Sequence, residues 1–218
     1  MAGVAAMSVQ AGEVALPGEL TLPDEPAGVV VFAHGSGSSR HSPRNRAVAR
    51  GLTGAGFGTV LFDLLTPEEE QAGALRFDIP TLSRRLVAAV DWLDSQTAVR
   101  DLPCGLFGAS TGAAAALVTA AQRPGRIRAV VSRGGRPDLA GPSLAAVEAP
   151  VLLIVGGQDI LVRQMNDAAR QQLPGRCELT IVPRAGHLFE EPGALEQVTA
   201  LAVSWFTRYL HPAPLPPV

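Results

Sequence analysis

Short apolar runs alternate with longer stretches of helical periodicity along most of this chain. Each run is continuous and bounded by Gly or Pro, which is typical of parallel strands buried on both faces of a sheet. The runs cover residues 28–33, 58–62, 104–108, 129–132, 151–155 and 178–182. We therefore expect at least six parallel strands.

The stretches between these runs are long enough for crossover helices. They cover residues 43–54, 80–95, 111–122, 161–173 and 193–209. In the second of them, apolar side chains recur at steps of three and four residues and form one stripe, and Pro80 suits a first helical turn. This alternation predicts βαβ units and a mostly parallel α/β sheet flanked by helices.

The remaining segments predict less regular structure. Residues 14–22 favour a strand or hairpin with its turn at Pro17 and Gly18. Residues 63–79 carry an acidic run, Glu68 to Glu70, with little apolar periodicity, and indicate a surface loop or short helix whose acids face solvent rather than a metal. Residues 211–218 contain four prolines and predict a frayed tail. A single domain over residues 1–210 is the prediction.

Composition narrows the class of protein. Of the 218 residues, 47% are hydrophobic and 17% charged, which is enough apolar material for a buried core. The net charge is −2 and the arginines are scattered, so neither nucleic acid nor an anionic membrane is an expected partner. The sequence has no lysine, which excludes a lysine nucleophile.

Location and redox state follow from similar arguments. No stretch reaches the roughly 20 apolar residues that cross a bilayer, and residues 1–10 lack the positive start of a signal peptide. We therefore expect a soluble, cytoplasmic protein. Cys104 and Cys177 begin apolar runs without metal-ligand spacing, and inert core thiols are favoured over a disulfide.

A candidate nucleophile lies at Ser110, in the sequence Gly108-Ala109-Ser110-Thr111-Gly112. A predicted strand ends directly before this motif and a predicted alanine-rich helix follows it. In a G-x-S-x-G turn the small residues allow strand and helix to approach closely, and the serine hydroxyl is exposed. The helix N-terminus also favours the negative charge that develops during acyl transfer.

His187 and Asp159 are the candidate general base and its orienting carboxylate. Each follows a predicted strand, at the sheet edge where α/β proteins bind ligands, and the order Ser110, Asp159, His187 fits the G-x-S-x-G motif. Asp159 could instead cap the next helix, and Asp138 is a substitute orienter. His41 and His211 are read as surface residues.

The loop after the first parallel strand, residues 34–39, is rich in Gly and Ser. We expect the backbone N–H groups of Ser36 and Thr111 to stabilise a substrate oxyanion, with His34 supporting the loop by a hydrogen bond. A phosphate-binding turn is disfavoured because the third glycine and the P-loop lysine are absent. Arg40 and Arg133, with Arg44 nearby, are candidate contacts for an anionic substrate, although solvated surface arginines are the simpler interpretation.

Together these motifs resemble the α/β-hydrolase superfamily, in particular its small, lidless, dienelactone-hydrolase-like members. The resemblance rests on residues 34–37, 108–112, 156–159 and 185–187, in the expected order. It implies an eight-stranded, mostly parallel sheet, hydrolysis of an ester or lactone through an acyl-enzyme, and no metal or organic cofactor. Two departures argue against dienelactone itself as substrate: the nucleophile is Ser110 instead of cysteine, and Glu191 stands where an arginine would grip the substrate.

Three functions remain compatible with the sequence. The first is hydrolysis of a small-molecule ester or lactone by a Ser-His-Asp triad. The second is ligand binding without catalysis on the same fold. The third is acyl transfer to an acceptor other than water, or perhydrolysis, by the same residues.

Overall fold

The computed structural model describes residues 2–210, and within them a single eight-stranded sheet has the strand order β1-β2-β4-β3-β5-β6-β7-β8. Strands β3 to β8 are parallel, and β1 and β2 are antiparallel to their neighbours. The strands are β1 (Gly3–Ala11), β2 (Val14–Leu22), β3 (Val29–Ala33), β4 (Gly58–Phe62), β5 (Cys104–Ala109), β6 (Ile127–Arg133), β7 (Val151–Gly156) and β8 (Cys177–Val182). The six predicted parallel strands are confirmed.

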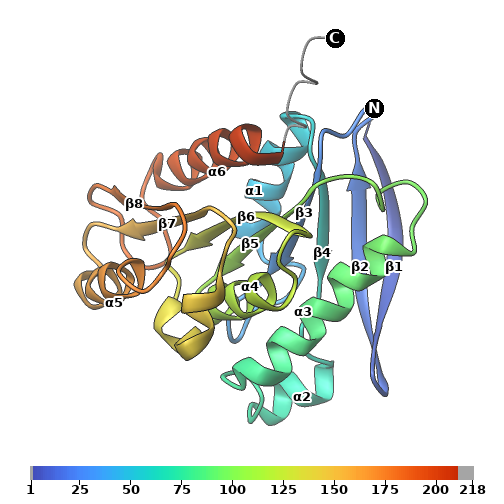
Figure 1. Cartoon of the computed structure of the whole chain (residues 1–218), viewed down its shortest axis with the longest axis horizontal. Coiled ribbons are helices and arrows are strands. Elements are labelled where there is room, and N and C mark those ends of the chain that lie inside the picture. Colours follow the sequence, from blue (N-terminus) through green and yellow to red (C-terminus); the bar gives the residue numbers. More distant parts are fainter. Residues whose placement is uncertain (1, 211–218) are drawn as a thin grey trace.

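Helices cover both faces of this sheet, as Figure 1 shows. Helices α1 and α6 contact each other on one face, and α3 and α4 lie together on the other. The helices are α1 (Pro43–Gly54), α2 (Pro67–Ala72), α3 (Ile79–Asp94), α4 (Thr111–Gln122), α5 (Ile160–Arg170) and α6 (Ala194–Leu210), with a 3-10 segment, η1 (Pro137–Ala146), after β6. No large domain is inserted among the described residues.

Two apolar layers hold the helices to the sheet. Because successive strand residues point to opposite faces and both faces are covered, strands β3, β4, β5 and β7 are buried at every position. Val131 of β6, for example, packs in the layer under α1 and α6, whereas Val130 packs in the layer under α3 and α4. This double burial keeps the carboxyl ends of the strands in fixed positions, and the candidate site residues follow those ends.

The predicted turn at Pro17 and Gly18 is wrong. The hairpin turns at Gly12 and Glu13, since Ala11 pairs with Val14 and Gly12 adopts a positive φ of 65°. Pro17 lies within β2, where its carbonyl accepts the N–H of Asp63 just past the end of the β2–β4 pairing. In an antiparallel strand the N–H and the carbonyl of one residue point toward the same neighbouring strand. The N–H that Pro17 lacks would therefore face β4 at the end of the β2–β4 hydrogen bonds, where its loss is tolerated.

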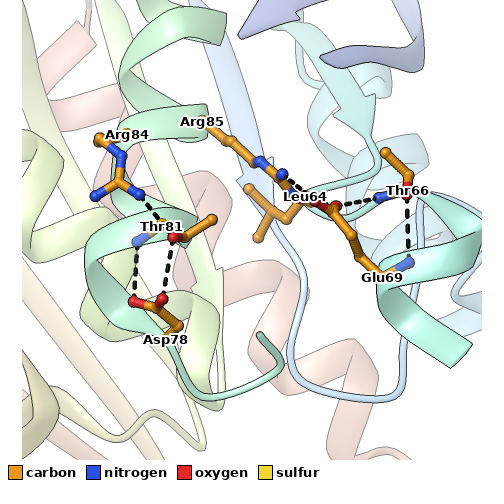
Figure 2. A network of polar contacts seen from close by, with 7 residues as sticks. All are labelled: Leu64, Thr66, Glu69, Asp78, Thr81, Arg84 and Arg85. Carbon is orange, nitrogen blue, oxygen red and sulfur yellow. Dashed lines mark hydrogen bonds and ion pairs between the residues drawn. The ribbon is translucent and has the colours of Figure 1, made fainter. Parts of the chain in front are cut away.

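The acidic segment after β4 is held by Arg85 of α3 (Figure 2). Arg85 is 8% exposed and contacts both carboxylate oxygens of Glu69 at 2.6 Å, and it also donates to the carbonyl of Leu64. Thr66 caps α2 and exchanges hydrogen bonds with Glu69. These hydrogen bonds lower the pKa of Glu69, above all that from Arg85. The segment therefore contains a short helix fastened to α3.

Both cysteines are free thiols. Cys104 is buried, and burial raises its pKa to about 12, while Cys177 is partly buried with its pKa raised to about 11. A raised pKa keeps the thiol protonated and unreactive at neutral pH. The proline-rich segment 211–218 lies outside the described residues.

Candidate active site

Ser110 has a strained backbone at the junction of β5 and α4. Its φ of 51° and ψ of −122° are rare for a residue with a side chain. A Cβ on Gly112 would lie 2.2 Å from the carbonyl oxygen of Ala33, and one on Gly108 would lie 2.4 Å from the Cα of Ala113. The close approach of helix and strand therefore requires glycine on both sides of the serine.

Neighbouring strands hold Ser110 from both sides. Its N–H donates to the carbonyl of Arg133 at the end of β6, and its own carbonyl accepts the N–H of Arg136. On the other side, a Cβ on Gly35 would lie 2.9 Å from the Ser110 Cβ and 3.7 Å from its Oγ. The half-buried serine thus stands where the carboxyl ends of β3, β5 and β6 meet.

The structure brings His187 and Asp159 together. The Nδ1 atom of His187 lies 2.6 Å from Oδ2 of Asp159, with 15% of the Asp159 side chain exposed. Asp159 stands at the N-cap position of α5, but its side chain makes no capping hydrogen bond, which argues against the helix-cap interpretation. Asp138, the substitute orienter, is paired with Arg136 instead.

The loop that carries His187 is fixed by close packing. A Cβ on Gly134 would lie 3.1 Å from the His187 carbonyl oxygen and 3.6 Å from its Nδ1, and one on Gly156 would lie 2.4 Å from the carbonyl oxygen of Gly186. Phe189 is fully buried at a positive φ of 56°. Glu191 accepts the N–H of Gly186 at 2.8 Å, so this acid holds the loop in place.

Ser110 and His187 both contact the segment of Arg133 and Gly134 but are not hydrogen bonded to each other. The Ser110 N–H is bonded to Arg133, and the backbone of His187 covers Gly134, the next residue. Among the described residues, no hydrogen bond links the serine hydroxyl to the imidazole. In unliganded enzymes catalytic hydrogen bonds are often long and tighten on binding substrate.

The loop after β3 is joined to the first turn of α4. The N–H of Ser36 donates to the hydroxyl of buried Thr111 at 3.0 Å, so in this structure it already has an acceptor. The backbone N–H of Thr111 belongs to the first helical residue and has no partner within the helix. Both predicted donors thus lie at the N-terminus of α4, the helix that follows Ser110, and one of them is engaged by a side chain.

His34 supports this loop, as predicted. Its Nε2 accepts the N–H of Leu64 at 2.9 Å, which leaves the proton on Nδ1, 3.0 Å from the carbonyl of Gly35. Burial lowers the pKa of His34 from its ordinary value of 6.5. A neutral imidazole with one fixed tautomer therefore ties the loop to the segment that follows β4.

The three candidate substrate arginines differ in their partners. The guanidinium and the N–H of Arg40 both bond to Asp63, which gives this residue a structural role in the loop. Arg44 pairs with Glu190 at 2.9 Å. Arg133 is 8% exposed, and within residues 2–210 its side chain has no hydrogen-bond partner.

Residues 2–210 hold neither a metal-ligand cluster nor a membrane-spanning helix. No cluster of three or more His, Cys, Asp or Glu side chains there could hold a metal ion. None of the helices in residues 2–210 combines the length and apolar character needed to cross a membrane.

Two curated relatives place these observations among known proteins. A putative phosphoribosyl transferase of Mycobacterium tuberculosis is 61% identical over 204 residues, which are 94% of this chain and 46% of that protein. The chain thus spans about half the length of that relative. A probable 2-oxo-3-(5-oxofuran-2-ylidene)propanoate lactonase of Bradyrhizobium sp. is 32% identical over 66% of each chain.

Solved structures agree with the observed architecture. The crystal structure of a dienelactone hydrolase from Anabaena variabilis superposes with a TM-score of 0.94 at 56% identity, covering 96% of this chain and 99% of that one. The esterase domain of a Rhodothermus marinus protein shares the fold, with a TM-score of 0.77 at 20% identity over 95% and 99% of the two chains. The sequence model of the alpha/beta hydrolase domain matches residues 26–203. The chain therefore belongs to the α/β-hydrolase family and is a dienelactone-hydrolase-like member of it.

Proposed function

We propose that the protein is a serine hydrolase that cleaves a small ester or lactone through an acyl-enzyme. The observation that carries this proposal is the 2.6 Å contact between His187 and Asp159, at the same sheet edge as the strained Ser110. The three side chains come from the ends of β5, β7 and β8, in the order expected for a G-x-S-x-G hydrolase. The family and its esterase relatives support a hydrolase.

In the proposed mechanism Ser110 Oγ attacks the carbonyl carbon while His187 Nε2 takes the hydroxyl proton. Asp159 accepts the Nδ1 proton, fixes the tautomer and stabilises the imidazolium. His187 then protonates the leaving alcohol. Water, activated by the same imidazole, attacks the acyl-enzyme and releases the acid.

The oxyanion is proposed to lie between the backbone N–H groups of Thr111 and Ser36. The Thr111 N–H belongs to the first turn of α4, where the helix dipole also favours negative charge. The Ser36 N–H, now bonded to the Thr111 hydroxyl, would have to turn to the substrate oxygen or donate to both acceptors.

The names of the relatives bear on the choice of reaction. We attribute the transferase name of the Mycobacterium tuberculosis protein to the part that this chain does not match, since the matched part has the hydrolase fold. The lactonase name of the Bradyrhizobium relative favours a lactone over an acyclic ester. Cytoplasmic location stays a prediction from the sequence.

Hydrolysis of p-nitrophenyl acetate by wild type and Ser110→Ala tests the proposal. We expect a loss of at least about 10³-fold in kcat for the variant, the scale on which a triad serine acts. Ser204→Ala, an exposed serine of α6, is the matched control and should keep the wild-type rate. A fluorophosphonate probe should label Ser110 and no other serine. Equal rates in wild type and Ser110→Ala would contradict the proposal.

The alternatives have their own measurements. An added alcohol or peroxide that diverts most of the acyl group from water would identify a transferase or perhydrolase. Binding of a ligand without turnover of any ester, and without probe labelling, would identify a non-catalytic receptor.

A further inference from the structure

Arg133 is a buried arginine that lacks a counter-ion. Its side chain is 8% exposed, and its Nε and Nη1 atoms are buried without any partner among residues 2–210. Burying a charged group without a partner costs several kcal/mol in general, so such groups are almost always paired. The exception here calls for a partner that comes from outside residues 2–210.

This arginine lies next to the nucleophile. It is the last residue of β6, pairs in register with Ala109 of β5, and accepts the Ser110 N–H at its carbonyl. Side chains alternate along a strand, so that of Arg133 points to the same face as Val131, the face covered by α1 and α6. The guanidinium is thus at the mouth of the sheet, on the α1 side of the serine.

The charged group that acts on Arg133 is another arginine, Arg44, which is also positive. Burial, and then the nearby guanidinium of Arg44, lower the pKa of Arg133 to about 10. The Nη1 atom of Arg44 donates a hydrogen bond to Glu190, while its Nε is also buried and has no partner within the described chain. By contrast, Arg40 and Arg136 on neighbouring loops are each neutralised by an aspartate. The unpaired positive charge is therefore that of Arg133, with Arg44, itself paired with Glu190, close beside it.

We propose that Arg133, assisted by Arg44, binds an anionic group of the substrate, a carboxylate or a phosphate. The bound oxygens would accept from the guanidinium N–H groups, once the side chain turns to expose them, and supply the missing negative charge. As a substrate assignment this rests on the proposed hydrolase function, since the anion site adjoins Ser110. The ester or lactone cleaved by this protein then carries a fixed negative charge.

Calorimetric titration with succinate and with inorganic phosphate tests the anion site without any turnover. Wild type and Ser110→Ala should bind at least one of the two anions, and Arg133→Met should weaken that binding about ten- to one-hundred-fold. Arg128→Met, an exposed arginine at the other end of the same strand, is the matched control and should bind as wild type does. The anion that binds more tightly identifies the substrate group. Failure of both anions to bind wild type, or equal binding by Arg133→Met, overturns the proposal.

Kinetics then connect the anion site to catalysis. We expect the ratio of kcat/KM for p-nitrophenyl hemisuccinate to that for its methyl ester to fall at least about tenfold in Arg133→Met and in Arg133→Gln. An unchanged ratio in a folded variant overturns the substrate assignment. If no ester is hydrolysed but Ser110→Ala still binds anions through Arg133, the proposed function fails and the anion site stands.

Stability supplies a third readout and guards against misfolding. A buried arginine without a partner destabilises the fold, so Arg133→Met should unfold at a temperature equal to or higher than that of the wild type. A purely structural arginine would give the opposite result. A marked loss of stability in Arg133→Met therefore counts against the proposal.

Discussion

The hydroxyl oxygen of Thr111 accepts the backbone N–H of Ser36 at 3.0 Å and thereby joins the first turn of α4 to the loop after β3. The two residues are far apart in the sequence, which predicts a role only for their backbone N–H groups. The contact shows that the side chain of Thr111 also takes part in the site.

Thr111→Val should therefore loosen the loop. Valine has a similar shape but offers no acceptor, so the half-buried Ser36 N–H loses its partner, at a cost of about 1 kcal/mol in the free energy of unfolding. We expect kcat for ester hydrolysis to fall about tenfold as the loop shifts away from α4. Thr111→Ser keeps the hydroxyl and should restore both values. A Thr111→Val enzyme as fast and stable as wild type would show that the contact is incidental.

Gly156→Ala should displace the loop that carries His187. The new Cβ would lie 2.4 Å from the Gly186 carbonyl oxygen and 2.5 Å from that of Ala185, and these backbone atoms must move. We expect a loss of about 2 kcal/mol or more in stability, and a loss of activity beyond that explained by unfolding. Circular dichroism melts and rates measured well below the melting temperature separate the two effects.

Gly54→Ala is the matched control for that substitution. A Cβ on Gly54 meets no atom within 4 Å, and the residue lies at the end of a helix. Alanine there should leave stability unchanged or slightly raised, because it favours helix more than glycine does. If both alanine variants behave alike, close packing at Gly156 does not position His187.

Acid should weaken the fold through His34. Its folded-state pKa lies below 6.5 because burial disfavours the charged ring. Between that lowered value and pH 6.5 the unfolded chain therefore binds a proton that the folded chain does not. Stability contributed by neutral His34 is present above about pH 6.5 and is lost as the pH falls.

Urea titrations between pH 7.5 and 5.5 check this dependence, in a range where carboxylates contribute little. His34→Gln should be less stable than wild type at pH 7.5, and its free energy of unfolding should change less with pH. His41→Gln, at an exposed position, should retain the wild-type dependence. The same pH dependence in His34→Gln and wild type would assign the effect to other groups.

Glu69→Gln should destabilise the contact of α2 with α3. The substitution removes the charge that faces the buried Arg85 across two 2.6 Å contacts. Because Glu69 is partly exposed, we expect a loss of about 1–3 kcal/mol rather than the larger cost of a fully buried pair. Glu68→Gln, at an exposed neighbour, should cost little in the same thermal melts. Equal stability of the two variants would mean that water replaces the ion pair at no cost.

Much of the fold could be predicted from the sequence because its central strands are buried on both faces. Such strands are buried at every position, as β3 and β4 are, and their residues are mostly apolar, with Gly or Pro at their ends. Strand β1 was missed because it lies at the sheet edge with most of its residues exposed, Val4 among them at 68%. Without a buried face, the alternation of apolar and polar residues in β1 does not indicate a strand. The sequence therefore predicts the hairpin turn at Pro17 instead of Gly12.

The sequence predicts which residues lie at the candidate site better than it predicts the contacts between their side chains. Positions just after predicted strands indicate Ser110, Asp159 and His187 as site residues. The structure places Asp159 in contact with His187. Pairings between distant side chains leave no local signal. The bonds of Arg40 to Asp63 and of Asp138 to Arg136, and the absence of any partner for Arg133 in the described chain, needed the structure.

The peptide groups of Leu64 are both engaged, the N–H by His34 and the carbonyl by Arg85. What this position contributes to the neighbouring loop is thus main-chain chemistry, independent of its leucine side chain. Exchange for another aliphatic residue would preserve both bonds, whereas proline would delete the donor that selects the protonated nitrogen of the His34 ring. A backbone amide far away in the sequence in this way selects the tautomer of a buried histidine.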